Sequence, residues 1–393
     1  MADAGLVKLL QSLVSTPSVN PEDTTDSSIS GEFRMAEVVA AWLENRGFRV
    51  AKEEEFPKRP NLIAELGPPD APFTLTIEGH LDTVSVAGMS IPPFEGRVDK
   101  GKLYGRGACD MKGPMAAALW ALKPKLLNRW VRSGCRLIFV GAIDEEKGCR
   151  GATNLARTKR FHTDELIVLE PTELVIVHAH KGALWYDVEV KGTPGHGSAP
   201  EKGFNAIRSI FPVIQMIEEE ATEAGQSFGN KHIGFPTVNI GKIEGGSAVN
   251  IVPGNCRISV DRRTVPGESQ DKILEKVREG LVRQMEQGVV KTFHVRPVLF
   301  SRAFDGGSDS QLVHRLSNAV RDHGHVVRTG GTGWYSDAGA LSSLSKETVV
   351  FGPGSIEQAH TADEFIELED LQAGADILET FLDETITRKA VVT

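Results

Sequence analysis

Histidines and carboxylates that could bind a metal recur at the ends of the strands expected in this sequence. Residues 73–78 alternate apolar and polar positions as a short strand does, and the chain then reaches His80 at the strand's carboxyl end. Two residues on, Asp82 can accept a hydrogen bond from the ring nitrogen of His80 that faces away from a metal. Asp110 follows on a glycine-rich turn, just before a helix-like segment at 111–123. An isolated His-x-Asp triplet more often has an ordinary surface or capping role, so its meaning depends on the rest of the chain.

Two further expected strands add carboxylates. Residues 136–143 and 165–169 are near-continuous apolar runs, which are typical of central strands covered on both faces. The first run ends on the acidic triplet 144–146, and the second ends on Glu170. Ligand sites in α/β sheets gather at the carboxyl ends of the strands, so this edge is the expected site.

Two imidazoles and three carboxylates form the expected metal site: His80, Asp110, Glu146, Glu170 and His360. One carboxylate shared by two metals, with one His and one Glu for each, would give two zinc sites that keep open positions for water, as catalytic zinc requires. Adjacent side chains diverge in an extended turn, so Glu146 could bind metal while Glu145 acts as general base on the bridging water. Each residue alone has an ordinary alternative, such as a solvated acidic loop. Their joint placement at strand ends favours the metal site.

Composition narrows the class of protein. Hydrophobic residues make up 40% and charged residues 25% of the chain, as in an ordinary globular protein. The net charge of −9, without a Lys/Arg block, argues against nucleic acid or an anionic membrane as partner. No apolar run approaches the ~18 residues of a membrane span, and the amphipathic amino-terminal segment lacks signal-peptide features, so a cytoplasmic protein is expected. The four cysteines lack CxxC spacing and are expected as buried thiols in a reducing compartment.

Length and pattern indicate two domains. The 393 residues exceed the ~250 to 300 at which single cores usually stop growing. After residue 182 the strands alternate strictly, and the order strand, helix, strand, strand, helix, strand is that of a split βαβ fold with an antiparallel sheet. We therefore expect an α/β catalytic domain from residues 1–182 and 299–393, with a mixed, mostly parallel sheet and helices on both faces. A ferredoxin-like α+β lid domain at 183–298 is expected to be inserted into it.

The elements of these domains can be placed coarsely. Outside the strands already named, the patterns predict strands at 48–51, 61–66 and 347–351. They predict helices ending near residue 14 and at 32–45, 204–221, 270–287, 308–322 and 368–387. Pro124 should end or kink the helix that follows Asp110.

The motifs together resemble one family. The chain is similar to the dizinc amidohydrolases that include acetylornithine deacetylase, succinyl-diaminopimelate desuccinylase, aminoacylases and carboxypeptidase G. The resemblance rests, in order along the chain, on GHLDTV, LYGRGACDMKG, DEEKG, EPT, GTPGHGSAP, GGSAVNIVPG with DRRTVPGE, GGTGWYSDAGAL and GPGSIEQAHTADEF. It spans nearly the full length.

The resemblance implies a role for each candidate ligand. It makes His80, Asp110 and Glu170 the ligands of one zinc. Asp110 also serves the second zinc, together with Glu146 and His360. Cobalt or manganese would also fit such ligands, because the choice depends on affinity order and availability.

Further roles come from the same resemblance. It makes Glu145 the general base and Asp82 the partner that orients His80, and it implies a cis peptide bond after Asp110. It makes the inserted segment a lid through which such enzymes commonly form homodimers. It also places His196, in GTPGHGSAP, where it would reach the partner subunit's site and bind the developing oxyanion.

The sequence offers candidates for substrate binding but identifies the substrate only in part. Arg263 and the backbone of Gly354 and Ser355 are candidates to hold a substrate carboxylate, because an Arg suits bidentate binding; Arg263 could equally be a surface residue at a strand end. Asn250, in GGSAVNIVPG, is a further candidate. Glu170, where some branches of the family have Asp, is typical of the deacylase and carboxypeptidase branches. The Trp334–Tyr335 pair departs from the family's usual pattern and either packs or lines the acyl pocket.

Three functions remain open at this point. The first is hydrolysis of the amide of an N-acyl-L-amino acid, as in acetylornithine deacetylase or succinyl-diaminopimelate desuccinylase. The second is the same chemistry on a peptide, in a carboxypeptidase or dipeptidase. The third is a catalytically silent binding relative, which is disfavoured because every ligand and Glu145 are present.

Overall fold

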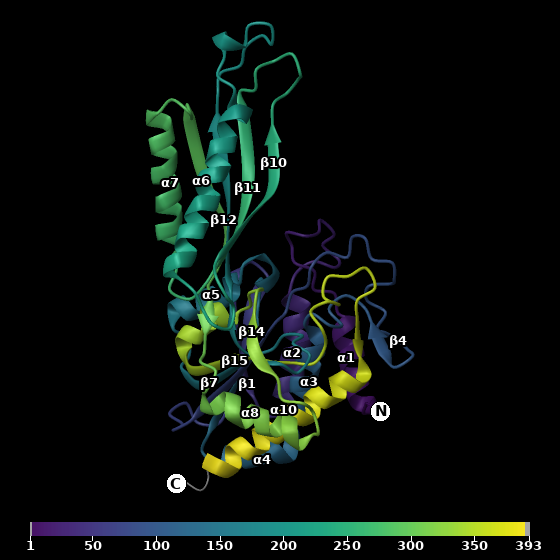
Figure 1. Cartoon of the computed structure of the whole chain (residues 1–393). Coiled ribbons are helices and arrows are strands. Elements are labelled where there is room, and N and C mark those ends of the chain that lie inside the picture. The colour runs from purple at the N-terminus through teal and green to yellow at the C-terminus, as the bar shows by residue number, and fades with distance from the viewer. Residues whose placement is uncertain (1, 390–393) are drawn as a thin grey trace. The chain divides into compact units, whose positions relative to one another are not determined.

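The computed structural model describes residues 2–389, and the chain forms two compact units (Figure 1). The first unit contains the residues up to 179, residues 306–330 and those from 336 onward. The second contains residues 180–305 and 331–335. The expected lid segment, 183–298, falls within the second unit, which also contains residues 180–182, 299–305 and 331–335.

The larger sheet has parallel strands at its centre. Its order is β1-β2-β6-β3-β7-β15-β8-β13, and β14 pairs with β8. The pairs β6–β3, β3–β7 and β7–β15 are parallel, while β1–β2, β2–β6 and β15–β8 are antiparallel. These strands are β1 (Arg49–Phe56), β2 (Arg59–Leu66), β3 (Thr74–His80), β6 (Arg136–Ala142), β7 (Thr163–Val168), β8 (Ile176–His180), β13 (Phe304–Asp305), β14 (Thr329–Thr332) and β15 (Ser345–Val350).

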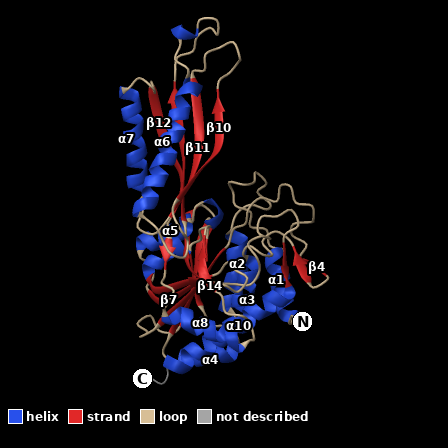
Figure 2. Ribbon diagram, viewed as in Figure 1, coloured by secondary structure: helices blue, strands red, loops and turns tan. Residues whose placement is uncertain are grey.

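Helices cover this sheet on both sides, with α5 on one side and α8 and α10 on the other (Figures 1 and 2). Leu75 and Ile77 of β3 share one hydrophobic core with α1–α4, α8 and α10. Successive side chains of a strand point to opposite faces, so Glu78 and His80 leave β3 on the other face. The helices are α1 (Ala4–Val14), α2 (Phe33–Glu44), α3 (Lys112–Ala121), α4 (Pro124–Arg132), α5 (Arg150–Thr158), α8 (Gln311–Asp322), α9 (Ala338–Leu341) and α10 (Leu368–Lys389). The expected fold class is confirmed.

Several boundaries follow from local chemistry. Pro124 takes the first position of α4, where its missing N–H is not needed, so the helix after Asp110 ends before it as predicted. Asp3 and Ser310 begin α1 and α8 by accepting hydrogen bonds from the exposed amides of the first turn. The sequence patterns missed the short elements α4, α5, α9, β8, β13 and β14.

A small sheet that was not predicted ties two loops together. It consists of β4 (Arg97–Asp99), β5 (Lys102–Tyr104) and β16 (Phe365–Glu367), with β5 in the middle. Phe365 pairs with Tyr104 in an antiparallel register. The glycine-rich turn before Asp110 therefore lies beside the segment that follows His360.

The second unit has the expected split βαβ order. Its elements are β9 (Gly182–Lys191), α6 (Ala206–Ser227), β10 (Thr237–Gly245), β11 (Asn255–Thr264), α7 (Gln270–Glu286) and β12 (Thr292–Ser301). The strands form one antiparallel sheet in the order β10-β11-β9-β12. Alternate residues of β9, such as Leu184, Tyr186 and Val188, join α6 and α7 in a separate core. The role of this unit as a lid stays a prediction.

Candidate metal centre

The carboxyl ends of the three central parallel strands meet at one edge of the sheet. His80 is the last residue of β3, Glu170 follows β7 by two residues, and the acidic triplet follows β6. Register fixes this arrangement, because Glu78 of β3 lies opposite Val140 of β6 and Val168 of β7. The strand-end placement predicted from the apolar runs is therefore what the sheet produces.

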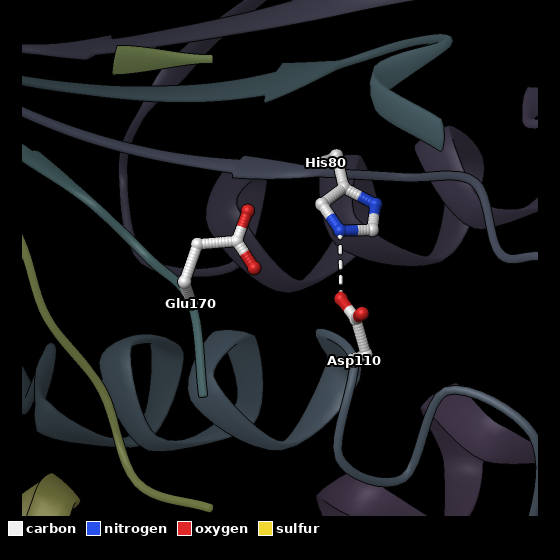
Figure 3. Close-up of side chains that lie close together, drawn as sticks. All are labelled: His80, Asp110 and Glu170. Carbon is white, nitrogen blue, oxygen red and sulfur yellow. Dashed lines mark hydrogen bonds and ion pairs between the residues drawn. The ribbon is translucent and has the colours of Figure 1, made fainter. Parts of the chain in front are cut away.

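Two groups of potential ligands form there and share Asp110. The first is His80, Asp110 and Glu170, and the second is Asp110, Glu146 and His360; within each group the ligand atoms lie within 4.8 Å of one another. Figure 3 shows His80 and Glu170 projecting toward each other from neighbouring strand ends, with Asp110 approaching from its loop. The structure thus brings together all five residues of the expected ligand set.

Asp110 lies between two imidazoles. Its Oδ1 is 3.1 Å from His80 Nε2, and its Oδ2 is 3.2 Å from His360 Nε2. His360 Nε2 is also 3.2 Å from the carboxylate of Glu146. Each oxygen of Asp110 faces a different histidine, which is the arrangement that a carboxylate bridging two cations requires. The peptide bond from Asp110 to Met111 is cis, as the resemblance implied.

The pKa values of these groups show that the cluster is short of positive charge. Burial and the nearby Asp110 raise the pKa of Glu146, and they push the pKa of Glu170 well above its ordinary range. Hydrogen bonds to Asp110 and Glu146 raise the pKa of His360 to about 11. Buried carboxylates whose pKa values are raised by burial and by neighbouring carboxylates are stabilised by added cations. The oxygen and nitrogen donors present fit a pair of divalent metal ions.

The acidic triplet differs in conformation from the extended turn that was expected. Asp144 has a left-handed backbone with φ of 69°, and Glu145–Lys147 form one turn of 3₁₀ helix. Adjacent side chains of such a helix point about 120° apart, since it has three residues per turn. Glu145 and Glu146 therefore still diverge. Glu146 approaches His360, while Glu145 is 7% exposed and its Oε1 lies 3.9 Å from Cys149 Sγ.

Burial makes Glu145 a strong proton acceptor. Loss of solvation raises its pKa well above the ordinary value, His80 opposes the shift, and the charges of Glu170 and Glu146 add to it. A carboxyl group with a raised pKa beside a metal centre has the property that a general base needs near neutral pH.

Asp82 orients His80 through a different atom from the one expected. His80 Nδ1 lies 3.0 Å from the main-chain carbonyl of Asp82 and 3.6 Å from its carboxylate. The carboxylate instead accepts hydrogen bonds from the amides of Glu145, at 3.1 Å, and Glu146, at 3.3 Å. A proton on Nδ1 leaves Nε2 facing Asp110. Asp82 therefore contacts both His80 and the acidic triplet.

Glu364 was missed by the sequence patterns, although it holds the loop that carries Asp110. One of its carboxylate oxygens accepts hydrogen bonds from the amides of Cys109, at 2.9 Å, and Asp110, at 3.0 Å. The other accepts from the amide of Gly107 and from Arg106, at 3.2 and 2.6 Å. Glu364 follows His360 by four residues, so one segment supplies a potential ligand and a support for another.

A buried pair of acids lies behind His80. Glu78 and Asp337 are 0% and 1% exposed. Burial and the neighbouring Asp337 push the pKa of Glu78 well above its ordinary range, and burial raises the pKa of Asp337 to about 6. The sequence gives no local signal for this pair, because Glu78 takes an ordinary polar position of the alternating segment 73–78 and Asp337 lies far along the chain.

The candidates for substrate binding fall into two groups. Gly354 and Ser355 lie in the first unit beside Asp110: Cys109 Sγ is 3.2 Å from the carbonyl of Ser355. Gly354 has φ of +90°, and a Cβ there would come within 2.9 Å of that sulfur, so glycine is required.

The remaining candidates belong to the second unit. The amide of Gly197, next to His196, donates to the carbonyl of Asn250 at 2.7 Å, so these two candidates are neighbours. Arg263 pairs with Asp261 at 3.0 Å and lies 5.9 Å from the centre of the Tyr335 ring. Trp334 lies 6.4 Å from His180, ring centre to ring centre. The roles of these residues toward a substrate stay predictions.

Comparison with known proteins agrees with this site. A model described as peptidase family M20/M25/M40 matches residues 76–384. The acetylornithine deacetylase of Myxococcus xanthus is 32% identical over 363 residues, which cover 89% of this chain and 90% of that protein.

Solved structures share the fold. The M20 family metallo-carboxypeptidase Sso-CP2 from Sulfolobus solfataricus is 19% identical and superposes with a TM-score of 0.78, covering 98% of this chain and 100% of that one. The YXEP protein of Bacillus subtilis, described as a dinuclear metal binding peptidase, is 15% identical with a TM-score of 0.68 and 98% coverage of both chains. The resemblance drawn from the motifs is confirmed: this chain belongs to the peptidase family M20/M25/M40 and is a hydrolase of amide bonds.

Proposed function

We propose that this protein is a metal-dependent deacylase that cleaves the amide bond of an N-acyl-L-amino acid, with N-acetylornithine as the first candidate substrate. One observation carries the proposal: the carboxylate of Asp110 presents one oxygen to His80 and the other to His360, with a Glu completing each group. The similarity to the acetylornithine deacetylase of Myxococcus xanthus over most of both chains supports the acyl substrate.

His80, Asp110, Glu170, Glu146 and His360 would hold two divalent cations, zinc first and cobalt or manganese as alternatives. When bound, such ions polarise a carbonyl oxygen and lower the pKa of water to about 7.

Glu145 is the proposed general base. It takes the proton of the attacking water and later gives it to the leaving amine, and its raised pKa suits both steps. The carbonyl of Asp82 orients His80, and the carboxylate of Asp82 holds the amides of Glu145 and Glu146.

Several parts of the chain offer candidates to hold the substrate. The backbone of Gly354 and Ser355, beside Asp110, is one candidate for the substrate carboxylate, and Arg263 and Asn250 are others. Trp334 and Tyr335 either pack within the second unit or line the acyl pocket.

Assembly and location complete the proposal. The second unit would serve as lid and as the interface of a homodimer, in which His196 of one subunit binds the oxyanion formed in the other. All four cysteines are buried and none forms a disulfide, which suits the reducing cytoplasm. Among residues 2–389, no helix is both long and apolar enough to cross a membrane.

The test is release of free amine by metal-reconstituted protein. The panel contains N-acetylornithine, N-succinyl-diaminopimelate, other N-acyl amino acids and dipeptides, and a chelated sample serves as control. We expect turnover of an N-acyl amino acid that chelation abolishes. Turnover of dipeptides alone would make the protein a peptidase, and no turnover across the panel would make it a silent binding relative.

A further inference from the structure

The polar loop between α1 and α2 has no part in the proposed reaction, yet it sends one side chain to the metal centre. Asn20 is 0% exposed. Its amide donates to the carbonyl of Thr83 at 2.8 Å, and the amide of Thr83 donates to the carbonyl of Ser18 at 3.0 Å. These backbone bonds fasten the loop to the chain that leaves β3 just after His80.

The side-chain amide of Asn20 joins two carboxylates. Its Nδ2 donates to Asp82 Oδ2 at 2.8 Å and to Asp144 Oδ1 at 3.0 Å. Its Oδ1 accepts from the amide of Glu22 at 3.1 Å, which fixes which end of the group is oxygen. Both N–H bonds of the NH₂ group are therefore used, each on a different acid.

Asp82 and Asp144 are placed to support His80 and the acidic triplet. Asp82 contacts His80 through its carbonyl and receives the amides of Glu145 and Glu146 on its carboxylate. Asp144 begins the 3₁₀ turn from a left-handed conformation, with φ of 69°, which is uncommon for residues other than glycine, Asn and Asp. Asn20 is the group that connects these two acids directly.

The charges around Asn20 explain why a neutral amide, and not a carboxylate, occupies this position. Arg59 pairs with both Glu32 and Asp144, and Arg150 also reaches Asp144. Burial alone would lower the pKa of Arg59, but its bonds to Glu32 and Asp144 raise it, so its charge is retained. A carboxylate in place of Asn20 would add a further negative charge within about 3 Å of Asp82 and Asp144. A neutral double donor satisfies both acids without that repulsion.

We infer that Asn20 is a positioning residue of the metal centre: it fastens the strand that carries His80 to the acidic turn and fixes the directions in which Glu145 and Glu146 leave that turn. The inference rests on the proposed roles of Glu145 and Glu146. Groups that support metal ligands typically change metal affinity or activity by ~10- to 100-fold when removed.

The test uses three variants of the full-length protein. Asn20→Ala removes both donors, Asn20→Asp keeps the shape but loses them, and Asn20→Ser keeps one donor and is the variant most certain to fold. Zinc affinity is measured by competition with a chelator, and kcat and KM are measured on the substrate that the wild type prefers. We expect ~10- to 100-fold weaker zinc binding or lower kcat for Ala and Asp, a smaller effect for Ser, and little change in KM.

Ser310→Ala is the matched control. Ser310 caps α8 by accepting from the amide of Val313 at 3.2 Å, far along the chain from any proposed ligand. Its removal should lower the melting temperature while leaving zinc affinity and kcat unchanged. If the Asn20 variants behave as this control does, Asn20 is a structural residue only and the inference is wrong. Zinc affinity needs no substrate, so this outcome is distinct from a failure of the proposed deacylase activity.

Discussion

Replacing Glu364 tests whether a single buried carboxylate supports the loop of Asp110. Four donors surround the Glu364 carboxylate and form its cradle: the amides of Gly107, Cys109 and Asp110 and the guanidinium of Arg106. Glu364→Gln keeps the size of the side chain, but its one carbonyl oxygen can accept from only one pair of these donors. With the oxygen on the amides of Cys109 and Asp110, the new NH₂ group faces the amide of Gly107 and the guanidinium of Arg106, both of which are donors.

The structure sets the size of the effect. The side chain of Arg106 is 3% exposed and that of Glu364 0%, so the substitution leaves a buried charge without its partner. Breaking such a pair costs about 3–5 kcal/mol. An unsatisfied Gly107 amide would cost about 1–3 kcal/mol alone, but the two losses share one site and do not add simply. We expect the free energy of unfolding to fall by about 3–5 kcal/mol, a large part of the ~5–15 kcal/mol of an ordinary domain.

Urea unfolding of the chelated protein measures this loss without a contribution from metal. The matched control is Glu367→Gln, three residues on, because Glu367 pairs with Lys102 at 3.1 Å on the surface, where an ion pair contributes about 0–1 kcal/mol. If Glu364→Gln lowers the free energy of unfolding no more than this control does, the cradle does not stabilise the loop and the reasoning fails.

Three further predictions concern the centre itself. Glu145→Gln should keep both metals and lower kcat by ~10² to 10⁴, whereas Glu146→Gln should lose metal; metal analysis showing the reverse would exchange their roles. The pKa of His360 is about 11 in the metal-free protein, and only the neutral imidazole binds metal, so zinc binding near pH 8 should release protons and tighten as pH rises. Calorimetry in buffers of different ionisation enthalpy measures that release, and a heat independent of buffer would contradict it. His196→Ala should keep its zinc and lose ~10² to 10³ in kcat. An equal mixture of His196→Ala with Glu145→Gln should recover about a quarter of the activity by random reassortment of a two-fold dimer, and no recovery despite subunit exchange would rule out action across subunits.

The sequence predicted those parts of the site that follow from strand periodicity. His80 could be placed because an alternating segment ends there, and Glu170 because an apolar run ends there, each where a strand reaches the sheet edge. The second unit could be outlined because its strands alternate strictly, as half-buried antiparallel strands do. Both are repeating local patterns, which a single sequence carries.

The supporting residues could not be predicted in this way. Asn20 bonds to residues 62 and 124 positions away, and Glu364 holds amides 254 and 255 positions away. Such contacts depend on which loops meet in three dimensions, and the periodicity of the sequence carries no information on this. The weak signal available was position: Asn20 lies in a turn-forming segment, and Glu364 follows His360 within one motif.

The conformation of the acidic triplet could not be predicted from the sequence, for a related reason. An isolated Asp-Glu-Glu after a strand is compatible with an extended turn. In the structure, the amides of Glu145 and Glu146 donate to Asp82, and Arg59 donates to Asp144; these contacts accompany the 3₁₀ form. The predicted divergence of Glu145 and Glu146 held because both conformations separate adjacent side chains.

The distribution of buried arginines separates the metal centre from the other acidic clusters. Three buried carboxylates away from the centre are matched by guanidinium groups: Glu364 by Arg106, Glu268 by Arg262, and Glu165 by Arg315. At the centre, within residues 2–389, Asp110 and Glu146 form ion pairs only with histidines, and Glu170 forms none. Burying an unmatched carboxylate is costly, so bound cations would stabilise these three acids where no guanidinium does. This shortage of positive charge, together with the two imidazoles, is why the edge of the sheet suits a metal site.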